Sequence, residues 1–230
     1  MTTAETRVVI LVDTYTRIPR LRPSFGFAAL VVVGDTPILL DVGPDYGTLA
    51  TNAAALGIDL DTIQYIVISH WHGDHAAALP DFLERHSTRV ITPTPPPSRI
   101  SRLAKEVVVA RHPVQIAPGA WSTGVLGYGV PEQSLIAHSP KGPVVVVGCS
   151  HPGISAILQR AARVANTDFV YALIGGYHTS DSQTVIRALR DFRVQVAVPT
   201  HCTPSNVIDA VRQQLPEAFH EGGVGASFSF

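Results

Sequence analysis

The chain has 230 residues and a formal net charge of −1, with 46% hydrophobic and 15% charged residues. This length and balance are typical of one compact domain with a buried core, and they exclude a disordered chain. A net charge so close to zero gives no general reason to expect nucleic acid as a partner. The sequence has no apolar run long enough to cross a membrane, and its first residues do not resemble a secretion signal. We therefore expect a cytoplasmic protein.

Apolar periodicity predicts an α/β chain that is rich in strands in its first half and alternates strands with helices in its second. The expected strands are 7–12, 27–33, 37–41, 65–68, 88–92, 106–110, 114–116, 121–125, 134–138, 144–147, 169–174, 194–198 and 225–230. The expected helices are 45–56, 76–85, 98–105, 152–165, 182–192 and 205–215. Neither a linker nor a break in composition divides the chain, so we predict a single domain over residues 1–230.

Two basic segments can each be interpreted in two ways. The loop predicted at 14–24 carries three arginines, and the helix predicted at 98–105 has Arg99, Arg102 and Lys105 at intervals of three. Such segments are ordinarily solvated surfaces. The alternative is a basic rim that attracts an anionic substrate.

The strand predicted at 65–68 runs into a loop with three histidines and an aspartate within six positions, namely His70, His72, Asp74 and His75. Crowded imidazoles would repel one another when protonated, and a bound divalent cation removes that problem. His70 and His72 are two residues apart and can face the same way, while Asp74 and His75 follow at a helix start. This spacing suits two adjacent metal ions better than one.

The same order of apolar strand, histidine and helix recurs along the chain. It occurs at His70, His151, His178 and His201. Because the ends of neighbouring strands lie at one edge of a sheet, we expect these four histidines to meet there.

The segment HWHGDH resembles the HxHxDH signature of the metallo-β-lactamase superfamily. Further segments resemble a subgroup that includes the archaeal dihydropterin ribofuranosylaminobenzene phosphate synthases. These are LVD at 11–13, LDVG at 40–43, NAAALGIDL at 52–60, GCSHPGI at 148–154, IGGYH at 174–178 and PTHCT at 199–203. The resemblance covers nearly the whole chain and implies an αββα sandwich, with two mixed β-sheets flanked by helices.

The resemblance also implies metal ligands. It assigns His70 and His72 to a first ion, and Asp74, His75 and His201 to a second. Imidazole and carboxylate ligands suit zinc, with Fe, Mn, Co or Ni as alternatives.

It further places Asp41 behind a ligand histidine as a hydrogen-bond acceptor that fixes the imidazole tautomer. The alternative for Asp41 is a cap on the turn before Gly43.

The chain departs from the common pattern at two positions. That pattern has a histidine before the strand that ends at Gly148 and a metal-bridging aspartate directly after this glycine. Gln133 and Ser134 stand near the first position, and Cys149 stands at the second. His151 is therefore the best further ligand, and a water molecule alone can bridge the metals. Thiolate coordination by Cys149 and a buried thiol are the other interpretations, and we expect His151 to matter more than Cys149.

Two residues are candidates for catalysis. Two metal ions can generate a hydroxide near neutral pH, and Asp74 is expected to hold it while binding the second ion. His178 has no evident place among the ligands, so we expect it to donate to a developing oxyanion or to protonate the leaving group. The alternative is a histidine that supports a ligand from behind.

The sequence thus predicts a metal-dependent hydrolase acting on phosphodiesters or other small anionic esters. The alternatives are a pterin-pathway type of synthase that forms a bond from a phosphoribosyl substrate, and a lactone or thioester hydrolase. A diiron redox protein is disfavoured because flavodiiron relatives carry glutamate at the position of His72. A metal-binding partner protein and an antibiotic hydrolase are also disfavoured. The expected partner is a small anionic substrate, and we expect the protein to bind neither nucleic acid nor a membrane. The sequence is compatible with a homo-oligomer.

Overall fold

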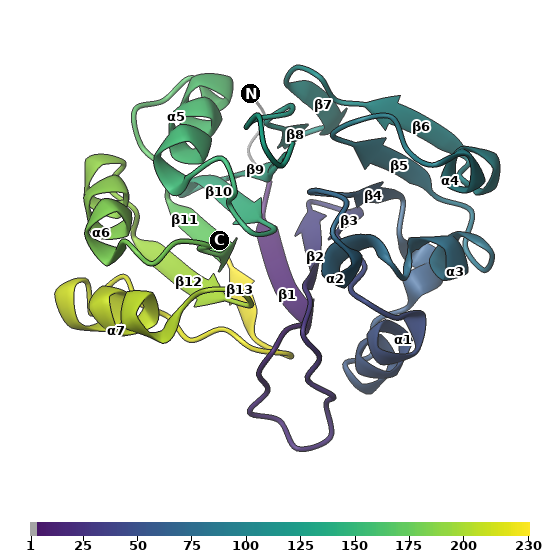
Figure 1. The fold of residues 1–230 in the computed structure, drawn as a ribbon, viewed down its shortest axis with the longest axis horizontal. Helices are drawn as coiled ribbons and strands as arrows, with labels where there is room; N and C mark the ends of the chain where they lie inside the picture. The colour runs from purple at the N-terminus through teal and green to yellow at the C-terminus, as the bar shows by residue number, and fades with distance from the viewer. Residues whose placement is uncertain (1–3) are drawn as a thin grey trace.

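The computed structural model describes residues 4–230 and consists of two β-sheets packed face to face, with helices on the outer side of each (Figure 1). The strand order is β13-β1-β2-β3-β4-β5-β6 in the first sheet and β12-β11-β10-β9-β8-β7 in the second. Both sheets combine parallel and antiparallel pairs. The predicted αββα sandwich with two mixed sheets is therefore confirmed.

The strands of the first sheet are β1 Thr6–Val12, β2 Ala28–Val33, β3 Thr36–Leu40, β4 Tyr65–Val67, β5 Arg89–Thr92, β6 Glu106–Val109 and β13 Ser227–Ser229. Those of the second are β7 Val114–Ala117, β8 Ala120–Ser122, β9 Leu135–Ser139, β10 Gly142–Val147, β11 Ala172–Gly176 and β12 Val196–Thr200. The α-helices are α1 Tyr46–Ala55, α2 Gly73–Ala76, α3 Leu79–Leu83, α4 Ser98–Leu103, α5 Ile154–Ala165, α6 Ser182–Asp191 and α7 Ser205–Gln214. A 3₁₀ helix, η1, spans Leu60–Thr62.

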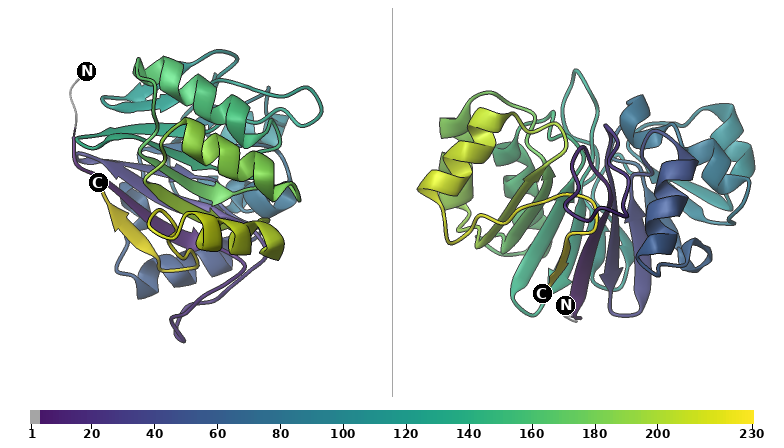
Figure 2. Two further views of the ribbon diagram at one scale, coloured as in Figure 1. Left: turned by 90° about the vertical axis from the view of Figure 1, so that its left-hand side faces the viewer. Right: turned by 90° about the horizontal axis from the view of Figure 1, so that it is seen from below.

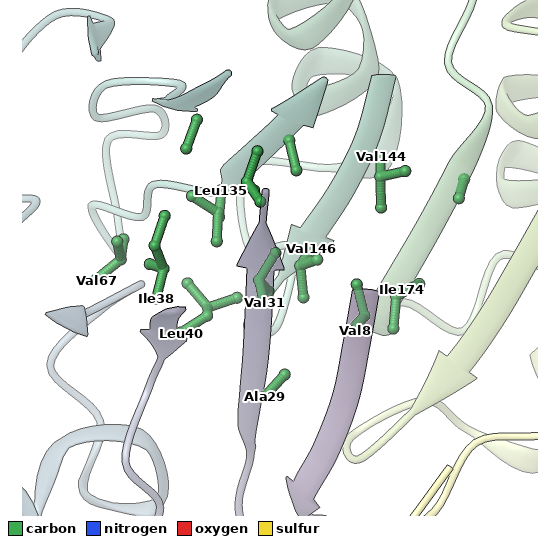
Figure 3. Packing of buried hydrophobic residues seen from close by; sticks show 14 of the residues in the cluster. Val8, Ala29, Val31, Ile38, Leu40, Val67, Leu135, Val144, Val146 and Ile174 are labelled. Carbon is green, nitrogen blue, oxygen red and sulfur yellow. The ribbon is translucent and has the colours of Figure 1, made fainter. Parts of the chain in front are cut away.

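Alternation of side chains along the strands builds the three apolar layers of the sandwich. In β10, Val144 and Val146 face the first sheet, whereas Val145 and Val147 face the helices on the outside. Strand β1 divides its residues in the same way. The inner layer contains residues from both sheets, as Figure 3 shows for Val31 of β2. Because both faces of each sheet are covered, the strands read as nearly unbroken apolar runs.

The helices cover the outer faces in two groups. Helices α5, α6 and α7 lie side by side over the second sheet, and α1 to α4 cover the first (Figures 1 and 2). None of the helices within residues 4–230 is long and apolar enough to span a membrane.

The helix predicted at 76–85 is divided into α2 and α3. Pro80 lies in the first turn of α3 and has no amide hydrogen for the carbonyl of Ala76, so one helix cannot run through this point. The amide of Ala78 donates instead to the carbonyl of Gly43, at 3.2 Å. The break ties the end of the histidine-rich segment to the loop after β3.

The prediction that four strand ends share one sheet edge was wrong for His70. This residue follows β4 of the first sheet, whereas His151, His178 and His201 follow β10, β11 and β12 of the second. The histidines still meet because the ends of the two sheets face each other across the sandwich. At residues 225–230, β13 pairs with β1 at a sheet edge, as expected.

Replacing Ile38 by alanine tests the inner layer. Ile38 is fully buried between the sheets, so Ile38→Ala should lower the free energy of unfolding by about 2–5 kcal/mol. Chemical denaturation in the presence of a chelator measures this without a contribution from bound metal. Ile208→Ala, on partly exposed α7, is the matched control and should cost clearly less. Equal losses for the two variants would contradict the assignment of Ile38 to the core.

Candidate metal centre

The site lies where the loop from β4 to α2 meets the ends of β10 and β12. Gln133 fixes this loop, because its side-chain amide donates to the carbonyls of Ile68 at 2.8 Å and Ile91 at 3.1 Å. Its backbone amide donates to the carbonyl of Ser69 at 2.9 Å. Gln133, near the position of a superfamily histidine, thus has a structural role in holding the histidine-rich loop.

One group of donor atoms combines Asp74, His75, Cys149 and His201, three of which are buried. The Nε2 atoms of His75 and His201 are 3.2 Å apart, and the Oδ2 atom of Asp74 lies 3.3 and 3.0 Å from them. Cys149 Sγ lies 3.1 Å from His75 Nε2. A tetrahedral zinc site with bonds of 2.0–2.3 Å has ligand atoms roughly 3.3–3.6 Å apart, so this group is close to the size that zinc requires.

Asp41 supports His75 from behind, as the sequence predicted. His75 Nδ1 donates to Asp41 Oδ2 at 2.7 Å, which leaves Nε2 facing the donor group. The same carboxylate accepts from the backbone amide and hydroxyl of Ser69, at 2.7 and 2.6 Å. Asp41 has a positive φ of 56°, and these contacts from both sides hold it in that strained conformation.

A second group combines His70, Cys149 and His151, whose donor atoms lie within 4.8 Å of one another. The Ser69 hydroxyl donates to Asp41, so it accepts from His70 Nδ1 at 2.9 Å. The Nε2 atom of His70 therefore carries the free lone pair, and it is buried without a hydrogen-bond partner. The chain of hydrogen bonds thus fixes the tautomer in which Nε2 can bind a metal.

His72 lies beside this group, at the start of α2. Its ring centroid is 4.6 Å from that of His70 and 5.0 Å from that of His151. His72 is exposed, so its ring can approach the group from the solvent side. The structure therefore brings five of the six predicted ligand residues into two neighbouring groups and places the sixth, His72, beside one of them.

Glu132 supports the candidate site, and the sequence interpretation missed it. Its buried carboxylate accepts from His151 Nδ1 at 2.8 Å and from the backbone amides of Cys149, Ser150 and His151 at 3.0, 2.9 and 2.9 Å. It orients His151 as Asp41 orients His75, with Nε2 left free. The signal in the sequence was a single acidic residue beside Gln133, with no motif to mark it.

The electrostatics favour neutral His70 and charged carboxylates. Burial, followed by the nearby charge of His75, lowers the pKa of His70 to about 2. Burial works against ionised Glu132, yet the hydrogen bonds from the His151 ring and from the backbone amides of His151 and Ser150 lower its pKa to about 2. Burial likewise disfavours charged His75, but Asp41 raises its pKa to about 10. Although burial works against its charge, hydrogen bonds with His201 and His75 hold the pKa of the Asp74 carboxyl well below its usual range. Glu132 and Asp74 thus carry negative charge that can balance added cations.

His178 lies at the open side of the site. It is exposed, and its ring centroid is 4.9 Å from that of His151. Its backbone amide donates to the carbonyl of Cys149 at 2.9 Å. Its side chain belongs to a third group of donors with Cys149 and Cys202, and it is absent from the other two groups.

Aromatic and apolar side chains form the rim. The ring of Phe25, which is 63% exposed, lies 4.9 Å from that of His201. Phe25 belongs to the long loop between β1 and β2 that projects from the body in Figure 1. On another side, Trp71 and Ile100 line a small cavity of about 240 Å³ beside α2.

The basic segments are partly neutralised by nearby acidic residues. Arg99 pairs with Glu84 at 2.6 Å, and Arg17 pairs with Glu221. Arg102 and Lys105 are exposed.

The donor atoms fit divalent metal ions. Nitrogen, carboxylate oxygen and sulfur converge within short distances, and His70 Nε2 is a buried acceptor without a partner, which is costly unless a cation or a proton donor satisfies it. Ligands of these types suit zinc and related transition metals.

Comparison with known proteins identifies a matching family and a curated relative. The family model described as the metallo-beta-lactamase superfamily matches residues 21–158. A curated relative, the 7,8-dihydropterin-6-methyl-4-(beta-D-ribofuranosyl)-aminobenzene-5'-phosphate synthase of Methanocaldococcus jannaschii, is 24% identical over 84% of each chain.

Solved structures show the same fold. A metal-dependent hydrolase of the β-lactamase superfamily matches with a TM-score of 0.80 and 24% identity, over 97% of this chain and 98% of the other. Zinc-bound PqqB from Methylobacterium extorquens matches with a TM-score of 0.63 and 15% identity, over 97% of this chain and 100% of the other. The family match covers more than half of the sequence, and on this evidence the chain belongs to the metallo-β-lactamase superfamily and is an enzyme.

Proposed function

We propose that this enzyme is a hydrolase that holds two divalent metal ions, zinc in the first instance, and acts on phosphodiesters or other small anionic esters. The observation that carries the proposal is the pair of neighbouring donor groups, each backed by a buried carboxylate. His70, His72 and His151 would hold the first ion. Asp74, His75 and His201 would hold the second. Ions in such sites lower the pKa of bound water to about 7 and polarise the bond to be broken.

Two side chains would act on water and substrate. Asp74 Oδ2 faces both His75 and His201, and its other carboxylate oxygen is available to accept a hydrogen bond from an attacking water. His178 is exposed beside His151, where an imidazole can donate to a developing oxyanion or protonate a leaving group. Phe25 offers an exposed ring at the entrance for the apolar part of a substrate.

A synthase is the second candidate, and the named archaeal relative supports it. In such an enzyme the same site would activate a phosphoribosyl group for attack by an acceptor molecule instead of water. Reaction in ¹⁸O-labelled water separates the two functions. A hydrolase places the label in the product, whereas a synthase joins the sugar to the acceptor without it.

A substrate screen tests the hydrolase proposal directly. Metal-loaded protein should cleave a chromogenic phosphodiester such as bis(p-nitrophenyl) phosphate, and removal of the metals with a chelator should abolish the activity. A lactone and a thioester complete the panel. Absence of metal-dependent cleavage across all three substrate classes would refute the proposed function.

Single substitutions should separate the two ions. His70→Ala and His201→Ala each remove an imidazole from a different donor group, so each variant should lose metal relative to the two ions expected in the unaltered protein. His151→Ala should lower metal content or activity at least about tenfold. Elemental analysis gives the metal content, and exposed His112→Ala is the control. Full occupancy in both His70→Ala and His201→Ala would contradict the ligand assignment.

Glu132 should control metal affinity through His151. Glu132→Gln removes the charge and replaces one of the two oxygens that accept from His151 and three backbone amides by an amide NH₂ group, so metal affinity should fall about 10–100-fold. Competition with a chromogenic chelator measures the dissociation constant. Glu217→Gln, on the exposed surface, should leave it unchanged. Equal affinities for the two variants would show that Glu132 has no part in positioning the ligand.

His178 should affect turnover but not metal binding. Loss of one oxyanion donor costs about a hundred- to a thousandfold in turnover, so His178→Ala should lose roughly this factor while it keeps its metals and fold. Metal content and turnover must be measured on the same preparation. Unchanged turnover would make His178 structural, and lost metal would make it a ligand.

A further inference from the structure

Cys149 occupies a central place between the donor groups. It is the one residue common to the group around His75, the group around His70 and the third group with His178. Its side chain is nearly buried, at 2% exposure, and Sγ lies 3.1 Å from His75 Nε2. In the second group, Cys149 Sγ lies within 4.8 Å of a ring nitrogen of His70 and of one of His151.

The backbone holds Cys149 in this place from both sides. Its amide donates to Glu132 Oε1 at 3.0 Å, and its carbonyl accepts from the amide of His178 at 2.9 Å. The preceding residue, Gly148, is pressed against the histidine-rich loop, since a Cβ there would lie 2.2 Å from Ser69 Oγ. With its backbone satisfied and its neighbours fixed, Cys149 has a defined direction for Sγ.

The buried Nε2 of His70 is independent evidence that something binds between the groups. It has no partner within the described part of the chain, although its Nδ1 side is anchored through Ser69. A metal ion in contact with both His70 Nε2 and Cys149 Sγ would satisfy it. A second ion at His75 and His201 would lie on the other side of the same sulfur.

We propose that the Cys149 thiolate is a ligand shared by the two metal ions and bridges them. The inference deepens the proposed function and rests on its two-metal site. On binding, the S–H bond breaks, the proton leaves to solvent, and the sulfur electron pairs form the bonds to the metals. This gives Cys149 a greater role than the sequence alone favoured, beside His151 and not in place of it.

The second cysteine provides a matched control. Cys202 Sγ lies 3.3 Å from Cys149 Sγ, yet Cys202 belongs to neither the group around His75 nor the group around His70. Both residues are free thiols. An effect that follows from losing any thiol at this place should appear when either cysteine is replaced. An effect that follows from bridging should appear only when Cys149 is replaced.

Cobalt substitution tests the proposal without relying on activity. Thiolate bound to Co²⁺ gives a charge-transfer band in the near ultraviolet. We expect this band to grow through both equivalents of Co²⁺ added to the metal-free protein. It should be lost in Cys149→Ser, kept in Cys202→Ser, and absent from Cys149→Asp, whose carboxylate can still bridge. Cys149→Ser should bind the ions at least about tenfold more weakly, and Cys149→Asp should regain part of this loss.

The outcomes distinguish this inference from the function on which it rests. Two bound Co²⁺ ions and hydrolysis without the band would overturn thiolate coordination and leave the hydrolase intact. A band that stops growing at one equivalent would overturn the bridge. A band that survives in folded Cys149→Ser or Cys149→Asp would overturn the assignment to Cys149. Failure of the unaltered protein to bind stoichiometric Co²⁺ would overturn the proposed function, and the bridge with it.

Discussion

Two buried carboxylates hold the candidate metal centre from behind, one from each sheet. Asp41, at the end of β3, fixes His75 and Ser69, and through Ser69 it fixes the ring of His70. Glu132, before β9, fixes His151 and the turn after β10. Buried carboxylates are costly unless they are fully hydrogen-bonded, and here the donors they require are the ligand histidines and the turns that carry them. The same hydrogen bonds thus orient the candidate ligands and stabilise the turns that carry them.

The fold explains why such a site can form between sheets. Branched apolar residues on both faces of each strand allow the two sheets to pack closely, and glycines let the strand ends approach further. A Cβ at Gly148 would collide with the side chain of Ser69 and press on that of Asp41, and a Cβ at Gly176 would collide with the carbonyl of Gly148. Larger residues at these positions would separate the histidine-rich loop from the end of β10. The spacing of the candidate ligands is thus set by backbone packing as much as by the side chains themselves.

The sequence predicted most of the fold because each layer has a distinct apolar pattern, and the HxHxDH signature located the site. It predicted the role of Asp41 through the resemblance to a family. It did not reveal Glu132, because a buried acidic residue that accepts from backbone amides leaves no periodic signal. It also placed His70 on the wrong sheet, because strand–helix alternation describes neighbours along the chain and not the packing of one sheet on another. The break at Pro80 was missed because the apolar pattern continues through it.

The spacing of the ligands along the chain has a consequence for how the protein matures. Asp74 and His201 are in contact across 127 positions of sequence, and His75 and Cys149 across 74. Contacts of such long range form only after the sandwich has closed. During synthesis, the histidine-rich loop therefore emerges long before its partners and lacks the geometry to select a metal. If the site binds an ion as proposed, only the finished fold can select it. The bound ion would then stabilise the folded chain by about 2.7 kcal/mol at a concentration a hundred times the dissociation constant.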